Sequence, residues 1–338
     1  MRKLLNTLYV TTPDAYLTKD GENIVVKVQQ EEKFRIPILN IENVICFSYM
    51  GASPGVMKLC ADNDVGLCFM SPQGKFIART QGPTKGNVYI RERQYLLSAY
   101  EEKRLEISRL MIAGKILNSR TILCRFIRDY GDNPDVSKAI SRLSDIKKKV
   151  LAASSDDTLL GLEGLGANVY FGVFSNLITR QRNDFSFEGR NKYPPKDPVN
   201  AMLSFAYTLL THDITSALES TGLDPYMGIF HKIRPGRASL SLDLIEELRA
   251  YLCDRFVLSL INRQQISKKD FEENIGIRLS DNGRKKFIKS WQERKKEIIT
   301  HPFLKEKIEI GLLPHVQSLM LARKIRGVLS SYPVFIYR

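Results

Sequence analysis

The chain has 338 residues, of which 43% are hydrophobic and 26% are charged. It is therefore too apolar for a disordered protein and long enough for two folded domains. Its 51 lysines and arginines outnumber its 37 aspartates and glutamates, and the formal net charge of +14 favours a polyanionic partner. Residues 1–80 hold only 9 of the basic and 8 of the acidic residues, so the excess belongs to the later part of the chain.

The cysteines and the apolar stretches indicate in which cellular compartment the protein is expected. Five cysteines form an odd set without a CxxC spacing, which predicts free thiols in a reducing, cytoplasmic environment. The first residues lack the long apolar core of a signal peptide. The best membrane candidate, 159–179, is interrupted by Glu163, Asn168 and Asn176, which favours a buried helix. We therefore expect no membrane association.

The N-terminal part has the pattern of short strands. Runs rich in Val, Ile, Leu and aromatic residues predict strands at 4–10, 23–29, 34–39, 43–47, 66–70 and 75–79. Lys19-Asp20-Gly21 predicts a turn between two of them. Ser53 followed by Pro54 predicts the start of a helix over 54–63. Residues 1–80 are thus expected to form a small β-rich domain.

Glycine, proline and polar residues then predict a linker over 81–86. Beyond it the pattern is helical over 88–117, 119–130, 135–150, 156–182, 198–220, 240–262, 283–299 and 302–327. Asp197 before Pro198 predicts a capped helix start, and Ser154 with Asp157 and Ser267 with Asp270 predict capping boxes. The expected fold class is α+β with two domains, a β-rich one over 1–80 and a larger all-α catalytic one over 87–338.

A charged loop and helix over 223–249 form the most distinctive part of the chain. Pro225, Gly228, Pro235 and Gly236 exclude a helix in its first half, so a group of basic residues is expected on a structured loop. That group consists of His231, Lys232, Arg234 and Arg237. The helix that follows carries acidic residues at i, i+3 and i+4, namely Asp243, Glu246 and Glu247. Because like charges so close repel, a cation must offset them: an upstream arginine, Arg249 or a divalent metal.

Two interpretations of this stretch remain open on the residues alone. It is either a solvated acidic helix face after a basic loop, or a metal-assisted phosphodiester site. Imidazole with carboxylate oxygens suits Mn²⁺, Mg²⁺ or Zn²⁺, and arginines suit phosphate. Such a site needs another ligand, and Glu163 is the candidate because it lies among apolar residues of a predicted helix. An ion pair or an exposed helix edge would also explain Glu163.

Three separated motifs carry a family resemblance. They are EGLGANVYF at 163–171, PPKDPVNAMLSFAYTLL at 194–210 and GLDPYMGIFHKIRPGRASLSLDLIEELR at 222–249. In this order they resemble the spacer-acquisition integrase and endonuclease of CRISPR systems, the first-numbered CRISPR-associated protein, over nearly the whole chain. The opening LLNTLYVTTPDAYL looks like the type I-C branch of that family.

The resemblance implies a metal site and a reaction. Glu163, His231 and Glu246 would bind Mg²⁺ or Mn²⁺, with Asp243 or Glu247 as a neighbouring group or alternative ligand. The enzyme would be a homodimer that joins the second-numbered CRISPR-associated protein. It would insert short duplex DNA fragments into the repeat array, by attack of a 3′-hydroxyl on a backbone phosphate.

Two groups of basic residues are candidates for DNA binding. The first lies near the acidic helix and comprises Lys232, Arg234, Arg237 and Arg249; the second lies on a later helix and comprises Arg284, Lys285, Lys286 and Lys289. The later group either faces phosphates or is a solvated helix surface. Two other functions remain open, a metal-dependent nuclease or repair enzyme that uses water as its nucleophile, and a non-catalytic DNA-binding scaffold.

Overall fold

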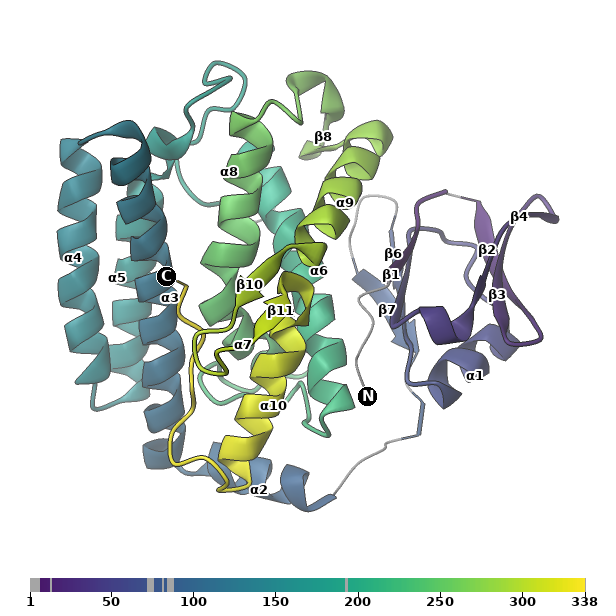
Figure 1. The fold of residues 1–338 in the computed structure, drawn as a ribbon, viewed down its shortest axis with the longest axis horizontal. Coiled ribbons are helices and arrows are strands. Elements are labelled where there is room, and N and C mark those ends of the chain that lie inside the picture. The colour runs from purple at the N-terminus through teal and green to yellow at the C-terminus, as the bar shows by residue number, and fades with distance from the viewer. Residues whose placement is uncertain are drawn as a thin grey trace. The chain divides into compact units, whose positions relative to one another are not determined.

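The computed structural model describes residues 7–12, 14–71, 76–80, 82–83, 88–191 and 194–337. The chain forms two compact units, one of 1–85 with 279–296 and the other of 86–278 with 297–338. Strands dominate the beginning of the chain and helices the rest (Figure 1). The predicted β-rich N-terminal part followed by helices is confirmed. Most of the predicted linker lies outside the described residues.

The first unit contains two sheets. β1 (Thr7–Val10), β5 (Asn43–Cys46), β6 (Gly66–Met70) and β7 (Phe76–Thr80) lie in that order, parallel except for the β6–β7 pair. β2 (Ala15–Asp20), β3 (Asn23–Val28) and β4 (Glu31–Pro37) form an antiparallel meander. Helix α1 (Pro54–Asp62) joins the parallel strands β5 and β6, as such strands require a crossover. The Oγ of Ser53 accepts a hydrogen bond from the Val56 N–H, which confirms the predicted helix start.

One element of the first unit comes from far along the chain. Helix α9 (Asp281–Lys296) belongs to this unit, although the prediction placed it in the helical domain. Gln292 donates to the carbonyl oxygen of Thr7 in β1, at 3.1 Å. The guanidinium of Arg284 lies over the ring of Phe47, 5.5 Å from its centroid. Such tertiary contacts cannot be read from the helical pattern of α9 itself.

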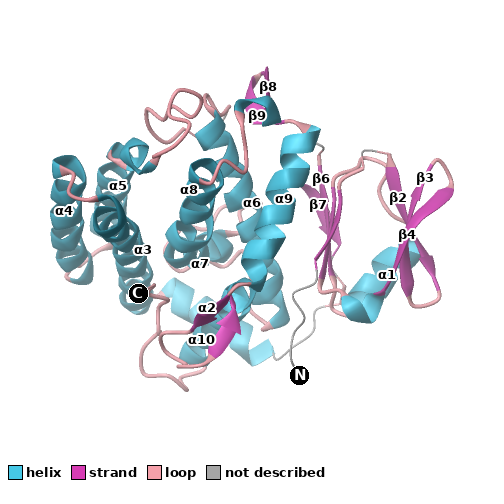
Figure 2. Cartoon of the chain, turned by 45° about the horizontal axis from the view of Figure 1, so that its top comes forward, coloured by secondary structure: helices cyan, strands magenta, loops and turns pink. Residues whose placement is uncertain are grey.

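The second unit consists mainly of helices (Figure 2). They are α2 (Val88–Ala99), α3 (Glu101–Tyr130), α4 (Pro134–Leu151), α5 (Asp156–Gly172), α6 (Pro198–Ser220), α7 (Ser239–Arg249), α8 (Arg255–Asn262) and α10 (Leu313–Ile325). α3, α4 and α5 run side by side (Figure 1). A cap from Asp197 to the Asn200 N–H starts α6 as predicted. The cap of α5 is Ser155 rather than Ser154.

The helical unit departs from the prediction in several places. The first long helix breaks at Tyr100 instead of near residue 118. A π-helical segment, Ala250–Asp254, separates α7 from α8. The predicted all-α composition is wrong, since β8 (Phe271–Asn274) pairs with β9 (Gly276–Leu279) and β10 (Ile298–Thr300) with β11 (Lys307–Glu309). These strands of three or four residues are too short to show an alternating pattern. The Ser267–Asp270 capping box exists but starts only a short 3₁₀ helix.

The cysteines are reduced, as the sequence predicts. None of the five cysteines, all of which lie in the described ranges, forms a disulfide bond, and Cys124 is the one that is partly exposed. Burial raises the pKa of the Cys46 thiol to about 11 and that of Cys60 to about 12. None of the helices in the described ranges is long and apolar enough to cross a membrane.

Candidate active site

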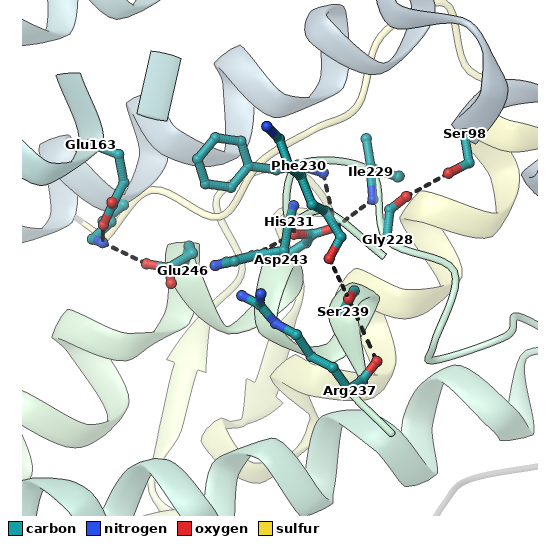
Figure 3. A network of polar contacts seen from close by, with 12 residues as sticks. Ser98, Glu163, Gly228, Ile229, Phe230, His231, Arg237, Ser239, Asp243 and Glu246 are labelled. Atoms are coloured by element: carbon teal, nitrogen blue, oxygen red, sulfur yellow. Dashed lines mark hydrogen bonds and ion pairs between the residues drawn. The ribbon is translucent and has the colours of Figure 1, made fainter. Parts of the chain in front are cut away.

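A single carboxylate organises the loop that precedes α7. Asp243 projects from the first turns of this helix and is 1% exposed. Its oxygens accept hydrogen bonds from three consecutive backbone N–H groups, those of Ile229 at 2.5 Å, Phe230 at 3.0 Å and His231 at 2.8 Å. The loop backbone around the histidine is therefore fixed to the helix. Figure 3 shows this network together with the neighbouring carboxylates.

Asp243 also fixes the imidazole of His231. The Nδ1 atom of this ring lies 2.7 Å from Oδ1 of Asp243. A carboxylate only accepts hydrogen bonds, so Nδ1 carries the proton and Nε2 keeps a lone pair for a ligand. The ring packs edge-on against Phe230, with 5.1 Å between centroids, and its side chain is 19% exposed. His231 is thus an oriented nitrogen donor at the edge of the protein interior.

The tight loop depends on Gly228. A Cβ atom at this position would lie 2.6 Å from the His231 carbonyl oxygen and 2.6 Å from Cβ of Ser239. Such distances are far below ordinary contacts, so only glycine fits here. The Gly228 carbonyl oxygen accepts a hydrogen bond from Ser98 at 2.7 Å, which ties the loop to α2. Gly228 therefore helps to set the position of His231.

Glu246 and Glu163 come together from different helices. Glu246 lies one turn after Asp243 on α7 and is 3% exposed, while Glu163 lies on α5. The ammonium group of Lys115, from α3, forms an ion pair with Glu163 and lies 2.7 Å from Oε2 of Glu246. The other oxygen of Glu246 lies 2.8 Å from Nη2 of Arg249. In Figure 3 Glu163 and Glu246 point toward each other, and the His231–Asp243 pair lies alongside.

The charges around Glu246 favour its ionised form. Burial by itself would raise the pKa of this carboxyl group. Arg249 and Lys115 outweigh burial, so that the pKa of Glu246 lies below its ordinary value. Glu246 is therefore a buried anion whose charge is balanced by nearby cations, and a solvated acidic helix face is excluded.

Glu247 faces away from this cluster. It accepts hydrogen bonds from Gln317, from the hydroxyl of Tyr332 and from the backbone N–H of Phe335. Burial raises its pKa to about 7, against the effect of these hydrogen bonds. Glu247 thus anchors the C-terminal segment to α7. The expectation that it is an alternative ligand or a neighbouring group of the site does not fit this geometry.

A cleft of about 710 Å³ opens beside the carboxylates. Lys115, Glu163 and Arg249 lie at its wall, and Arg190 and Tyr207 line it further along. The guanidinium groups of Arg249 and Arg190 lie over the Tyr207 ring, 4.8 and 5.2 Å from its centroid. The cleft thus adjoins the cluster, has a mixed lining in which Phe171, Phe187 and Leu242 accompany the charged groups, and is large enough for part of a substrate.

A buried aspartate supports one wall of this cleft. Asp254, in the π-helical segment, accepts a 2.5 Å hydrogen bond from the Tyr207 hydroxyl. Burial raises its pKa to about 6, although Tyr207, Arg249 and Arg190 act in the opposite direction. Asn200, in the second sequence motif, accepts from Arg190 at 2.7 Å and so positions this arginine.

The residues expected to contact DNA occupy different environments. Lys232 and Arg234 are exposed on the loop, and Arg237 is half-buried. Lys285, Lys286 and Lys289 are exposed on α9. Arg249 and Arg284 are instead largely buried in ion pairs, the first with Glu246 and the second with Asp281 at 2.7 Å. Arg284 is 3% exposed, so its geometry does not support DNA contact, whereas Arg249 is 21% exposed and lines the cleft.

Lys115 also belongs to the cluster, but the sequence motifs do not identify it. Its one signal in the sequence is a lysine within an otherwise apolar run of α3, residues 111–116. From the sequence, His231, Glu163 and Glu246 are the expected ligands of a metal. Within the described ranges no three histidine, cysteine or carboxylate groups approach closely enough to hold a metal together. The Lys115 ammonium lies between the two glutamates instead.

Comparisons with known proteins agree with this architecture. The family model "CRISPR associated protein Cas1" matches residues 8–293. CRISPR-associated endonucleases Cas1 from Chlorobaculum tepidum and Rhodospirillum rubrum are 44% and 47% identical, and each alignment covers all of both chains. A Cas1 protein from Thermotoga maritima has the same fold with a TM-score of 0.82 at 23% identity, covering 98% of this chain and 100% of that one. A casposase bound to integration product also gives 0.82, at 22% identity, covering 96% and 92%.

The fold and the site therefore define an enzyme of DNA cleavage and joining, with a β-rich N-terminal part and a helical part that carries the polar cluster. The chain belongs to the Cas1 family of CRISPR-associated proteins. It is accordingly an endonuclease and integrase of CRISPR adaptation. The family predicted from the three motifs is confirmed.

Proposed function

We propose that Glu163, His231 and Glu246 together bind one divalent ion, Mg²⁺ or Mn²⁺. The observation that carries this proposal is the His231–Asp243 contact, which leaves Nε2 free on the side of the two glutamates. These glutamates already share a cation, the ammonium of Lys115. One imidazole nitrogen and two carboxylates form a donor set that suits Mn²⁺ and Mg²⁺. The donor types of these residues therefore suit the ion that the family implies, and the Lys115 ammonium lies between the two carboxylates in its place.

Asp243 is assigned a positioning role rather than that of a ligand. Its two oxygens serve three backbone N–H groups and the His231 ring. Coordination of a metal would have to break several of these buried hydrogen bonds, which is costly. Glu246 is held instead by the cations Lys115 and Arg249. Its side chain is thus better suited to a direct ligand.

The residues divide the reaction between them. When bound, the ion acts as a Lewis acid on the oxygens of the scissile phosphate. His231, kept in one tautomer by Asp243, and the two glutamates hold it in place. Arg249 keeps Glu246 ionised. In the joining reaction the 3′-hydroxyl of a DNA fragment forms a new bond to phosphorus while the bond to the leaving 3′-oxygen breaks.

The DNA substrates would be short duplex fragments and the CRISPR repeat array. Lys232 and Arg234 are exposed on the loop that carries His231, which supports a role in contacting phosphates. A protein of similar fold is part of a Cas6-RT-Cas1–Cas2 complex, which supports a Cas2 partner for this chain. Assignment to the type I-C branch stays a prediction.

A strand-transfer assay tests the function and the site together. Labelled duplex fragments and a supercoiled plasmid with a repeat would be incubated with the protein and Mn²⁺. Joined product is expected, and Glu163→Gln should abolish it while leaving DNA affinity nearly unchanged. Nicked plasmid without joined product would instead indicate a hydrolase that uses water. Joining by Glu163→Gln at the wild-type rate would refute the ligand assignment.

We further propose a homodimer formed by the first unit. Its residues 1–80 carry almost no net charge, and apolar side chains such as Leu39 and Tyr49 are 76% and 71% exposed there. Sedimentation velocity on the full chain with Leu39→Glu and Tyr49→Glu would test this, because charged residues in an apolar interface should dissociate it. An unchanged dimer would exclude these residues from the interface. Removal of residues 1–85 is a weaker test, since it deprives α9 of its sheet.

A further inference from the structure

Lys115 has a buried side chain, whereas most lysines in proteins are exposed. It lies in the middle of α3 among buried residues, and its side chain is 7% exposed. A buried ammonium group is costly unless it is paired. Both of its partners are carboxylates of the proposed metal site, Glu163 and Glu246. The charge of Lys115 therefore belongs to the site rather than to the packing of α3.

The charges at this point balance without any metal. Glu163 and Glu246 contribute two negative charges, and Lys115 and Arg249 contribute two positive charges. Arg249 is held on the far oxygen of Glu246 and against the Tyr207 ring, so it cannot bridge the two glutamates. Lys115 pairs with both, and its ammonium therefore occupies the space between the two carboxylates.

We propose that Lys115 is a resident counter-ion that a divalent metal displaces. This inference rests on the proposed metal site. A bound Mg²⁺ lies about 2.0–2.1 Å from its oxygen ligands, whereas the Lys115 nitrogen lies 2.7 Å from the Glu246 oxygen. Both cations cannot use the same two oxygens, because they would be only a few ångströms apart and would repel each other. The metal and the Lys115 ammonium therefore compete for one pair of glutamates. The measured metal affinity reflects the free energy of metal binding less that of the Lys115 ion pairs.

The displaced side chain has a place to go. Lys115 lines the cleft beside the cluster, together with Glu163 and Ser204. Its four-carbon stem is flexible, unlike the guanidinium fork of Arg249. From the cleft its ammonium would face a substrate phosphate rather than the glutamates. Lys115 is thus a counter-ion of the two glutamates before metal loading, and its side chain can move into the cleft after it.

The first test measures Mn²⁺ binding directly, by electron paramagnetic resonance of the free ion. Lys115→Met removes the competitor while keeping the apolar stem, and we expect it to bind Mn²⁺ at least about tenfold more tightly than wild type. Lys115→Arg keeps a cation and should bind no more tightly than wild type. Lys149→Met, an exposed lysine of α4, is the matched control and should have no effect.

The same measurement on Glu163→Gln separates this inference from the metal site itself. Loss of Mn²⁺ binding in Glu163→Gln with unchanged or weaker binding in Lys115→Met would overturn the counter-ion role and leave the site intact. Wild-type binding in Glu163→Gln would overturn the metal site, and the inference with it. Tighter binding in Lys115→Met together with loss in Glu163→Gln supports both.

A second test uses the unaltered protein, in case Lys115→Met fails to fold. Lysine side chains would be labelled with an amine-reactive reagent with and without Mn²⁺, and peptides quantified by mass spectrometry. Displacement should raise labelling of Lys115 several-fold when Mn²⁺ is present, while Lys149 stays unchanged. Labelling of Lys115 that does not respond to a saturating concentration of Mn²⁺ would overturn the proposal.

Discussion

Asp243 and His231 are joined twice. One oxygen of the carboxylate lies 2.7 Å from Nδ1 of the ring and also accepts the backbone N–H of the same residue at 2.8 Å. The backbone and the side chain of His231 are therefore positioned by a single group on α7. Any change in Asp243 alters the geometry of the histidine before it alters the charge of the site.

Glu246 is proposed as a direct metal ligand, and a substitution at this residue tests that role. Glu246→Gln keeps the shape of the side chain but removes the charge, so it should abolish Mn²⁺-dependent strand transfer. DNA affinity should stay nearly intact, because Glu246 is buried and does not face DNA. Strand transfer and a binding titration on the same preparation would check both. Retained strand transfer would exclude Glu246 as an essential ligand.

Asp243→Asn should behave differently. The amide replaces one acceptor oxygen by a donor that faces backbone N–H groups, so the free energy of unfolding should fall by about 2–3 kcal/mol. Folded protein should keep measurable activity at high Mn²⁺, reduced about 10–100-fold, as for other groups that orient a metal ligand. Chemical denaturation and strand transfer across a Mn²⁺ series would measure the two effects. Full activity in Glu246→Gln and none in Asp243→Asn would reverse the assignment of the two residues.

Gly228→Ala should disturb the loop that carries His231, the same loop that Asp243 fixes to α7. The added Cβ would lie 2.6 Å from the His231 carbonyl oxygen, so the loop must shift and strand transfer should fall at least about tenfold. Gly161→Ala on α5 is the matched control, since nothing lies within 4 Å of a Cβ there. It should raise stability by roughly 0.5–1 kcal/mol, because alanine favours the helix. Equal effects of the two substitutions on activity would contradict a role for Gly228.

Local patterns allow much of this site to be predicted. Asp243, His231 and Glu246 lie within 16 residues of one another, so their spacing and the loop residues are visible in the sequence. Glu163 requires the family resemblance, because its partners come from other helices. Lys115 escapes prediction, since a contact across 48 residues with Glu163 depends on how α3 and α5 pack. The place of α9 in the first unit escapes it for the same reason.

The lysines of α9 lead to a prediction about DNA binding. Lys285, Lys286 and Lys289 are exposed, whereas Arg284 is not, so a test should change only the lysines. Replacing all three by glutamine should lower the magnitude of the slope of log affinity against log salt by roughly 0.9 for each phosphate that the protein no longer neutralises. Lys33→Gln with Lys58→Gln, which pair with Glu31 and Asp62, should leave the slope unchanged. An unaffected slope in the triple variant would show that these lysines do not contact DNA phosphates and that they form a solvated helix surface.

The last prediction concerns pH and the buried carboxyl group of Asp254. Burial raises its pKa from an ordinary value of 3.8 to about 6, so the folded state binds this proton more tightly than the unfolded state. The stabilisation from protonated Asp254 is therefore fully present below pH 3.8 and is lost as the pH rises toward 6. Such a difference in pKa corresponds to up to about 3 kcal/mol.

Asp254→Asn cannot ionise, yet its amide oxygen can still accept the hydrogen bond from Tyr207. The free energy of unfolding of this variant should therefore rise relative to that of the wild type as the pH rises from 4 to 7, by up to about 3 kcal/mol. Urea denaturation of both proteins at several pH values would measure the difference. Glu188→Gln, a change of an exposed carboxylate at the cleft, controls for the general effect of removing one charge. A difference between Asp254→Asn and wild type that does not vary with pH would show that Asp254 has no raised pKa in the folded protein.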